Sequence, residues 1–254
     1  MATLGGLLAM STTMTGQAAI ITGGARGIGA GIARRLASDG CRIVIWDRDL
    51  APLAADQNLV PAHSCAVDIT CLEAVEQAFA ETLEAVGEVQ ILVNNAGING
   101  PVIKHWDYPP EAWERVFAVN LTAVFYCCRT VVPHMRERGY GRIVTVASAA
   151  GKEGNPNICA YSASKAGVIG FCKAIAKELV GSGVMVNSIC PVMTQTELFR
   201  EMTQEHIDYC RGLIPMGRFP AIEEVAAMVA WMASPECSFT TGAVFDLSGG
   251  RATY

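Results

Sequence analysis

Tyr161 and Lys165 have side chains that could move a proton together. They stand four positions apart in YSASK, within a segment that is predicted to be helical, so both face the same way. A nearby ammonium group stabilises a phenolate, which would lower the pKa of Tyr161 from about 10 toward neutral pH. Ser148 ends an expected strand, and its hydroxyl could hydrogen-bond the oxygen that gains or loses the proton. This spacing is also common on solvated helix faces, so the catalytic interpretation of the pair depends on the other motifs in the sequence.

A glycine-rich loop, TGGARGIG at 22–29, follows an apolar stretch and opens an expected helix. Glycines there let the backbone approach a pyrophosphate, whose charge the helix N-terminus stabilises. Asp47 ends the next strand and could bind a ribose 2′-hydroxyl while repelling a 2′-phosphate, which favours NAD over NADP. Arg26 and Arg48 could offset that repulsion, and Asp47 could instead cap a turn.

Short apolar runs alternate with helix-length segments along the chain. Strands are expected at 17–22, 42–47, 59–67, 89–93, 142–147, 184–190 and 243–247, and helices at 27–39, 72–86, 111–138, 160–180 and 223–233. This order predicts an α/β fold: a single-domain, Rossmann-like, doubly wound sheet of about seven mainly parallel strands. Residues 1–14 are expected to be a loose N-terminal tail and 15–254 one domain. The long excursion at 194–219 would lie at the carboxyl ends of the strands, where ligands bind.

Composition excludes several classes of protein. The chain has 254 residues, 51% of them hydrophobic, and a net charge of −5, which argues against disorder and against non-specific nucleic-acid binding. We expect no membrane-spanning helix, because no window of about 18 apolar residues is evident. Ten cysteines form no CxxC pair and do not cluster with the four histidines, so no metal site is expected. Reduced thiols favour a cytoplasmic protein.

Together these motifs resemble the short-chain dehydrogenase/reductase family over nearly the whole chain from residue 15. The matching pieces are TGGARGIG at 22–29, Asp68, NNAG at 94–97, Asn120, Ser148, YSASK at 161–165 and Pro191. The resemblance implies that Tyr161 is the general acid/base and that Lys165 lowers its pKa and binds the nicotinamide ribose. It also implies that Ser148 positions the substrate oxygen and that Asn120 holds a water in a proton relay through Lys165.

The same resemblance implies an NAD site. Asn94, Ala96 and Gly97 would line its adenosine side, and Asp68 would either touch the adenine edge or cap a helix. The full set of expected cofactor-binding residues is Gly23, Arg26, Gly27, Ile28, Gly29, Asp47, Asp68, Ile69, Asn95, Ala96, Gly97, Tyr161, Lys165, Pro191, Thr194 and Thr196. Pro191 is followed by Val192 where the family usually has glycine. Valine does not readily adopt positive φ, so the sequence does not fix the backbone conformation at this position.

The family implies hydride transfer between a secondary alcohol or ketone and a nicotinamide. Within it, the stretch 152–157 and the C-terminal tail resemble bacterial dehydrogenases that oxidise 2-keto-3-deoxy sugar acids, such as L-fuconate or L-rhamnonate derivatives, at the 4-hydroxyl. The residues expected to bind this small-molecule substrate are Ser148, Lys152, Asn155, Tyr161 and Arg251. Family members commonly form homotetramers, in which Arg251 could clamp a carboxylate in a partner's site. The alternatives are a 3-oxoacyl carrier-protein reductase using NADPH and a non-catalytic nucleotide sensor.

Overall fold

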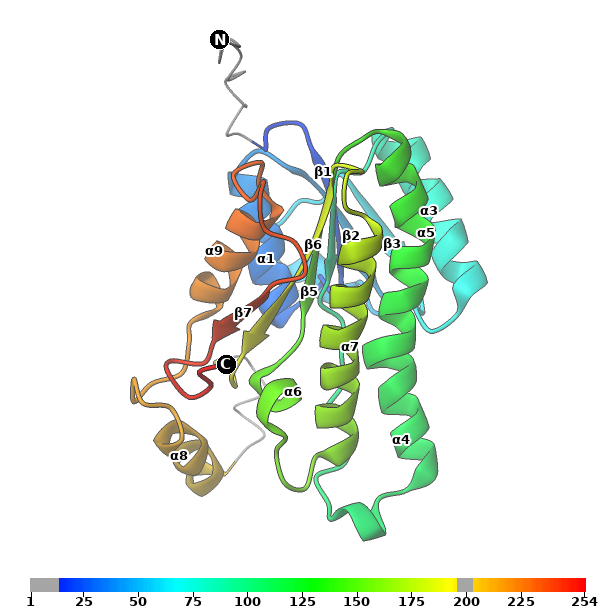
Figure 1. Ribbon diagram of the computed structural model, residues 1–254. Coiled ribbons are helices and arrows are strands. Elements are labelled where there is room, and N and C mark those ends of the chain that lie inside the picture. Colours follow the sequence, from blue (N-terminus) through cyan, green and yellow to red (C-terminus); the bar gives the residue numbers. More distant parts are fainter. Residues whose placement is uncertain (1–13, 196–202) are drawn as a thin grey trace.

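The computed structural model describes residues 14–195 and 203–254, and a seven-stranded sheet lies at its centre (Figure 1). The strand order is β3-β2-β1-β4-β5-β6-β7, and every neighbouring pair is parallel. The strands are β1 (Ala18–Thr22), β2 (Arg42–Asp47), β3 (His63–Ala66), β4 (Ile91–Asn94), β5 (Gly141–Val146), β6 (Val184–Pro191) and β7 (Val244–Leu247). The predicted fold class is confirmed, and the sheet is wholly parallel among the described residues.

Helices cover both faces of the sheet. In Figure 1, α1 and α9 lie on one side of it, and α3, α5 and α7 on the other. The helices are α1 (Gly27–Ser38), α2 (Ala51–Ala55), α3 (Leu72–Val86), α4 (Pro110–Phe117), α5 (Ala123–Glu137), α6 (Ala149–Glu153), α7 (Cys159–Glu178), α8 (Gln204–Gly212) and α9 (Ile222–Ala233). A 3₁₀ turn, η1 (His105–Asp107), precedes α4, and a π-turn, η2 (Ala118–Thr122), joins α4 to α5.

The central strands are buried on both faces, which explains their continuous apolar runs. Within β1, Ile20 belongs to the core beneath α3, α5 and α7, whereas Ile21 belongs to the core beneath α1 and α9. Adjacent residues of one strand thus supply two separate hydrophobic layers, because successive side chains point to opposite faces. This double demand for apolar side chains accounts for the high hydrophobic content of the sequence.

Sequence patterning locates the main elements but not the irregular ones. The expected helix 111–138 is interrupted by the π-turn, and the short helices α2 and α6 are not expected at all. Helix α8 lies within the excursion expected at 194–219. Met14, assigned to the loose tail, is buried and accepts a hydrogen bond from the amide of Gln17. The rest of that tail lies outside the described residues.

The continuous helical stretch Pro110–Glu137 contains an 18-residue window with a mean hydropathy of 1.5, so by length and composition it could cross a membrane. The expectation that no such helix exists is therefore wrong on composition alone. In the structure, however, α5 packs on α3 and α4 packs on α7. A core helix of an α/β layer satisfies the same criteria, and this helix occupies that position.

The topology fixes where a ligand would bind. The chain passes from β1 to β2 and β3 on one side, and β4 returns to the other side of β1. The loops after β1 and β4 therefore diverge at the carboxyl edge of the sheet, where open α/β sheets bind ligands. The glycine loop follows β1, the NNAG motif spans the end of β4, and Ser148 follows β5. All three expected motifs thus meet at one edge.

Candidate active site

The glycine loop lies very close to the segment after β4. A Cβ atom on Gly23, whose φ is +62°, would come within 2.9 Å of the Ala96 Cα. One on Gly29 would come within 2.1 Å of the Gly23 carbonyl oxygen. Helix α1 starts here with no side-chain cap at Arg26 and no acidic residue in its first turn. Its first amide groups, those of Gly27, Ile28 and Gly29 among them, are therefore suited to an anion such as a diphosphate.

Asn95 and Thr22 hold the two loops together. The Asn95 side-chain amide donates to the carbonyls of Thr22 and Gly23, both at 3.0 Å. The buried Thr22 hydroxyl accepts from the backbone amides of Asn95 and Ala96, at 3.0 and 3.1 Å. Thr22, which sequence reasoning gave no individual role, is thus the link between β1 and β4. The sequence signal for this role is its position as the first residue of the glycine motif.

Asp47 and Asp68 both end strands, or nearly so, at this edge. Asp47 Oδ2 accepts from the backbone amide of Ala25 at 3.1 Å, so the carboxylate is fixed against the glycine loop. Asp68 caps the turn before α3, because its Oδ1 accepts from both the amide and the hydroxyl of Thr70. Hydrogen bonds from Thr70 are also the main reason why the pKa of Asp68 is lowered. The adjacent Ile69 is buried.

Tyr161, Lys165 and Ser148 meet where α7 passes the end of β5. The Lys165 ammonium lies 5.8 Å from the centre of the Tyr161 ring and donates to the Val146 carbonyl at 2.6 Å. Ser148 Oγ accepts from the amide of Ala150 and so caps α6. The three expected side chains are therefore brought together. They could bind and deprotonate a hydroxyl group placed among them.

Burial dominates the electrostatics of this cluster. It raises the pKa of Tyr161, and a hydrogen bond with Ser148 lowers that pKa by a smaller amount. Burial also lowers the pKa of Lys165 to about 8. Tyr161 therefore lacks, in the protein alone, the lowered pKa that its spacing from Lys165 predicts, because burial disfavours the phenolate more than the hydrogen bond with Ser148 favours it.

Asn120 is fully buried in the π-turn between α4 and α5. Its Oδ1 accepts from the Ile98 amide at 2.8 Å, and its Nδ2 donates to the Ile98 carbonyl and the Ser164 hydroxyl at 2.9 and 3.1 Å. A Cβ on Gly97 would lie 3.2 Å from Asn120 Oδ1 and 3.4 Å from Lys165 Nζ. Asn120 thus borders the lysine, but its side chain already serves the loop after β4. A π-turn is often found at functional sites.

The segment after β6 has a valine where the family pattern has a glycine, and its backbone is not strained. Val192, in the usual glycine position, is buried against Ala149 and Ile214. Among described residues other than glycine, only Asn157 has a positive φ, so the backbone at Val192 is not the left-handed one that glycine would favour. Thr194 is buried and bonds to the Val192 carbonyl. Thr196, expected to bind the cofactor, lies outside the described residues.

The expected substrate-binding residues Lys152, Asn155 and Arg251 gather around α6. Lys152 Nζ pairs with Asp246 at 3.0 Å. Arg251 pairs with Glu153 through Nε and donates to Asn155 through Nη2, both at 2.8 Å. Within its own chain, Arg251 thus contacts Glu153 and Asn155, both in or just after α6. Asp246 and Glu153 are the partners that sequence reasoning missed.

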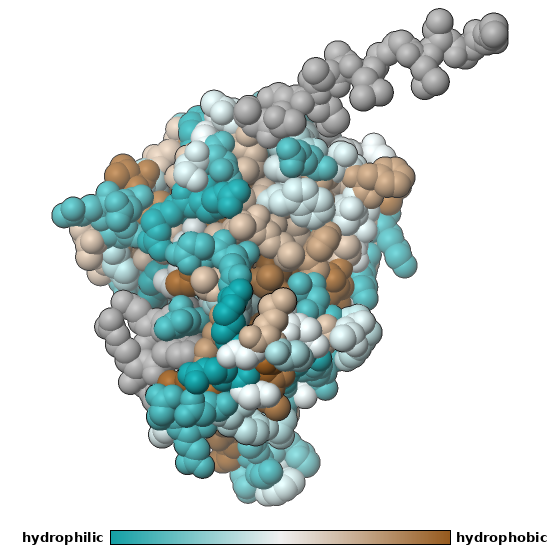
Figure 2. All heavy atoms as spheres, turned by 90° about the vertical axis from the view of Figure 1, so that its left-hand side faces the viewer, coloured by the Kyte–Doolittle hydropathy of each residue, from teal (hydrophilic) through white to brown (hydrophobic). Residues whose placement is uncertain are grey.

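One side of the molecule has a mixed surface. Figure 2 shows that the side of the molecule to the left in Figure 1 alternates hydrophilic bands with smaller hydrophobic patches. The C-terminal tail returns to α6 on the same chain, where the Tyr254 hydroxyl donates to the Lys152 carbonyl and the Tyr254 ring lies 5.3 Å from the Lys152 ammonium. The tail therefore belongs to the surroundings of α6.

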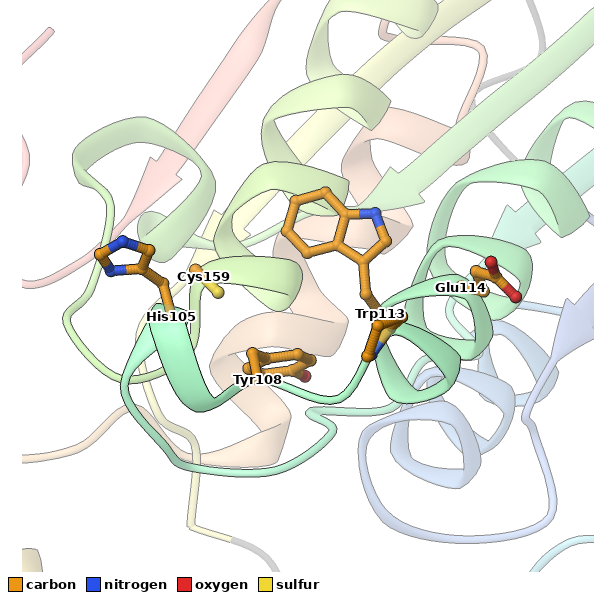
Figure 3. Close-up of a pocket in the computed structure, with 6 residues that line it drawn as sticks. His105, Tyr108, Trp113, Glu114 and Cys159 are labelled. Carbon is orange, nitrogen blue, oxygen red and sulfur yellow. The ribbon is translucent and has the colours of Figure 1, made fainter.

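A separate open cavity of about 530 Å³ lies beside the start of α7. Figure 3 shows His105 and Cys159 toward one end of it and Glu114 toward the other. Tyr108 and Trp113 contribute much of its aromatic lining. Tyr161, Lys165 and Ser148 are not among its lining residues, although Cys159 precedes Tyr161 by two positions on α7.

All ten cysteines are free thiols, and seven are buried. Burial raises the pKa of Cys41 and of Cys127 to about 12. The expectation that cysteines and histidines do not cluster is wrong in two places. Cys65 Sγ lies 3.2 Å from His63 Nε2, and Cys210 Sγ lies 3.6 Å from His206 Nε2. Both pairs are close in sequence, at spacings of two and four, which was a readable signal.

A doubly wound parallel sheet, a glycine loop at its switch point and a buried tyrosine–lysine–serine cluster beside it define a class, the nucleotide-dependent oxidoreductases. Comparison with known proteins identifies one family within that class. The profile of the short chain dehydrogenases matches residues 17–207, and the chain belongs to this family.

Similar proteins agree with that assignment. The chain is 49% identical, over 94% of its own length and 96% of the relative's, to a 2-dehydro-3-deoxy-L-rhamnonate dehydrogenase (NAD(+)) from Sphingomonas sp. (strain SKA58). An NAD⁺-bound xylitol dehydrogenase superposes with a TM-score of 0.87 at 30% identity, covering 93% of this chain and 99% of the other. A 3-ketoacyl-(acyl-carrier-protein) reductase from Brucella melitensis, complexed with NADH, gives 0.86 at 33% identity, with 94% and 99% covered.

Proposed function

We propose that the protein oxidises a secondary alcohol of a 2-keto-3-deoxy sugar acid, of the L-rhamnonate or L-fuconate type, with NAD⁺ as the hydride acceptor. The observation that carries this proposal is the 49% identity, over almost the full length of both chains, to the Sphingomonas enzyme. The tyrosine–lysine–serine cluster supplies the required proton chemistry, and the cationic groups around α6 suit an anionic substrate.

The residues of the site fit the proposed cofactor. The close packing of Gly23 on Ala96 leaves a backbone surface that a diphosphate can approach, and the uncapped start of α1 provides amide donors. Asp47 accepts one backbone hydrogen bond at each oxygen, from the amides of Ala25 and Asp49, and still keeps lone pairs for the hydroxyls of an adenosine ribose. A 2′-phosphate would meet this carboxylate with like charge. When bound, NAD⁺ supplies the hydride acceptor.

The chain's own residues would then handle the proton. Ser148 would orient the reacting hydroxyl through a hydrogen bond, and Tyr161, as phenolate, would remove its proton. Lys165 would keep positive charge near the phenolate while Val146 holds its ammonium in place. Asn120 would fix the loop after β4 through Ile98 and border Lys165, where a water could continue the proton relay.

Recognition of the substrate carboxylate is assigned to Lys152, Asn155 and Arg251. Arg251 uses Nε and Nη2 on its own chain, which leaves Nη1 for a carboxylate oxygen. Lys152 is paired with Asp246, and only 6% of its side chain is exposed. It would therefore attract the substrate carboxylate through its charge and would not bind it directly. Lys152 and Asn155 lie on α6 and just after it, shortly after Ser148, and Arg251 contacts Glu153 and Asn155 there.

A homotetramer in the cytoplasm completes the proposal. The edge strand β7 is half-buried along its length, and the partly exposed Trp231 stacks edge-on against Phe245 beside it. On the opposite helix layer, Trp113 and Phe125 are also exposed. Such aromatic groups favour contacts with further copies of the chain. Ten reduced thiols suit a reducing compartment.

The experiment is a screen of NAD⁺ and NADP⁺ reduction with 2-keto-3-deoxy and aldonic acids, and of NADH and NADPH oxidation with a 3-oxoacyl thioester. We expect turnover with NAD⁺ and a 2-keto-3-deoxy sugar acid, lost in Tyr161→Phe while that variant still binds the cofactor. Preference for NADPH and the thioester would instead assign an oxoacyl reductase. Cofactor binding without turnover on any substrate would overturn the enzymatic proposal.

A further inference from the structure

A histidine, a cysteine and a glutamate meet at the edge of the sheet. His63 and Cys65 are two residues apart on β3, so their side chains share a face, and Glu81 reaches them from α3. Cys65 Sγ lies 3.2 Å from His63 Nε2 and 3.8 Å from Glu81 Oε2. All three ligand atoms lie within 4.8 Å of one another. Strands β2, β1 and β4 separate β3 from β5, so the cluster is remote from the catalytic site.

We propose that His63, Cys65 and Glu81 bind a divalent transition-metal ion, with zinc preferred. A thiolate, an imidazole nitrogen and a carboxylate are the ligands that zinc takes in proteins. At normal zinc–ligand lengths, tetrahedral neighbours are roughly 3.5 Å apart. The sulfur–nitrogen and sulfur–oxygen separations bracket that value. Three protein ligands leave one position for water or another small ligand.

Neighbouring groups orient the ligands of the cluster and leave a path to it. Gln77 donates to Glu81 Oε1 at 3.0 Å, which leaves Oε2 directed to the sulfur. Such outer hydrogen bonds orient metal-binding carboxylates. His63 is only half-buried, which gives an ion access from solvent.

The metal would join an edge strand to a helix. Strand β3 has four residues and pairs only with β2 among the described strands, so its outer edge lacks a neighbour. An ion held by His63 and Cys65 from the strand and by Glu81 from α3 would bridge the two elements. The ligands do not form a closely spaced sequence motif, because Glu81 comes 16 residues after Cys65, and the sequence pattern therefore predicts no metal site.

The test is cobalt(II) titration of metal-free protein, followed by absorption spectroscopy. We expect one equivalent of cobalt to produce a thiolate charge-transfer band and the visible bands of tetrahedral cobalt. Zinc should displace it. Cys65→Ser should abolish the charge-transfer band, and Glu81→Gln should weaken binding by at least ~10-fold, since even outer-shell losses cost about that much. The matched controls are Cys71→Ser, an exposed thiol near a glutamate, Cys210→Ser, from the other cysteine–histidine pair, and Glu84→Gln on α3.

The proposal is overturned if wild-type protein gives no thiolate band, or if Cys65→Ser keeps it while Cys71→Ser or Cys210→Ser removes it. Because Cys65 is buried, its variant could fold poorly. Glu81→Gln changes an exposed side chain and provides an independent test by thermal unfolding. Zinc should raise the Tm of the wild type and of Glu84→Gln, and the shift should be absent or much smaller in Glu81→Gln. Equal shifts in all three proteins would contradict the site.

Discussion

The ammonium group of Lys165 donates to the carbonyl oxygen of Val146 at 2.6 Å. Val146 is the last residue of β5, two positions before Ser148, so the sheet itself fixes the lysine that stands beside Tyr161. Gly97 closes the other side, where an added Cβ would come within 3.4 Å of Nζ. The lysine is therefore held by the end of β5, and its ammonium group cannot swing away from the tyrosine without breaking a buried hydrogen bond.

The buried tyrosine predicts an alkaline pH profile for alcohol oxidation. The base form of Tyr161 is the phenolate, and burial raises its pKa, so kcat/KM for oxidation should rise about tenfold per pH unit below that pKa. Ketone reduction, which needs the protonated phenol, should fall over the same range. Lys165→Met should lower kcat/KM for oxidation mainly below about pH 8, where the lysine still carries the positive charge that favours the phenolate. Lys173→Met, on an exposed position of α7, is the control and should leave the profile unchanged.

The pair Lys152–Asp246 predicts a stability effect larger than that of a surface ion pair. The Lys152 side chain is 6% exposed and that of Asp246 28%. Lys152→Met would leave the carboxylate with only its Ser248 donors, at a cost of about 1–3 kcal/mol in the free energy of unfolding. In the exposed pair Arg211–Asp208, Arg211→Ala should cost about 0.5 kcal/mol or less. Urea unfolding of both variants measures the difference, and equal costs would contradict the prediction.

The buried side chain of Val192 leads us to expect that replacing it with the family's glycine destabilises the protein. Its side chain is buried against Ala149 and Ile214, and its φ is not positive. Val192→Gly should lower the free energy of unfolding by roughly 2–3 kcal/mol, from lost burial and from added backbone entropy in the unfolded chain. Thermal unfolding is the measurement. A stabilised variant would mean that the backbone relaxes to a conformation closed to valine.

His134 predicts a loss of stability in mild acid. Its Nε2 accepts from the Val89 amide at 3.1 Å, and burial, then Arg138, lowers its pKa. The folded protein therefore binds fewer protons than the unfolded chain, so this contribution is complete above about pH 6.5 and decreases as the pH falls below it. Between pH 8 and pH 5, His134→Gln should lose less stability than the wild type in urea unfolding. Parallel curves would rule out His134 as the source.

Local sequence patterns were sufficient for the framework and for placing the motif residues at one edge of the sheet. TGGARGIG and YSASK each hold their spacing within one turn or helix, so their placement follows from local structure. The pairing of Lys152 with Asp246 spans 94 residues and depends on β7 lying beside β6. The direction of the Tyr161 pKa likewise depends on burial by distant segments, which helical spacing does not reveal.

The irregular elements escaped prediction for a related reason. The π-turn at Ala118–Thr122 interrupts a sequence with unbroken helical character, because Asn120 is drawn inward to Ile98 and Ser164. Its amide partners become apparent only once the loop after β4 and helix α7 are in place. Tertiary contacts decide such a defect, and propensity alone favours a continuous helix.

The distribution of the thiols makes the protein convenient for attaching a probe. Cys71 is the exposed cysteine of the ten, whereas burial raises the pKa of most of the others and slows their alkylation. It begins the turn into α3, three residues after Asp68. A maleimide fluorophore could be attached to Cys71 without any substitution. Its emission would report on ligands that occupy the neighbouring strand ends.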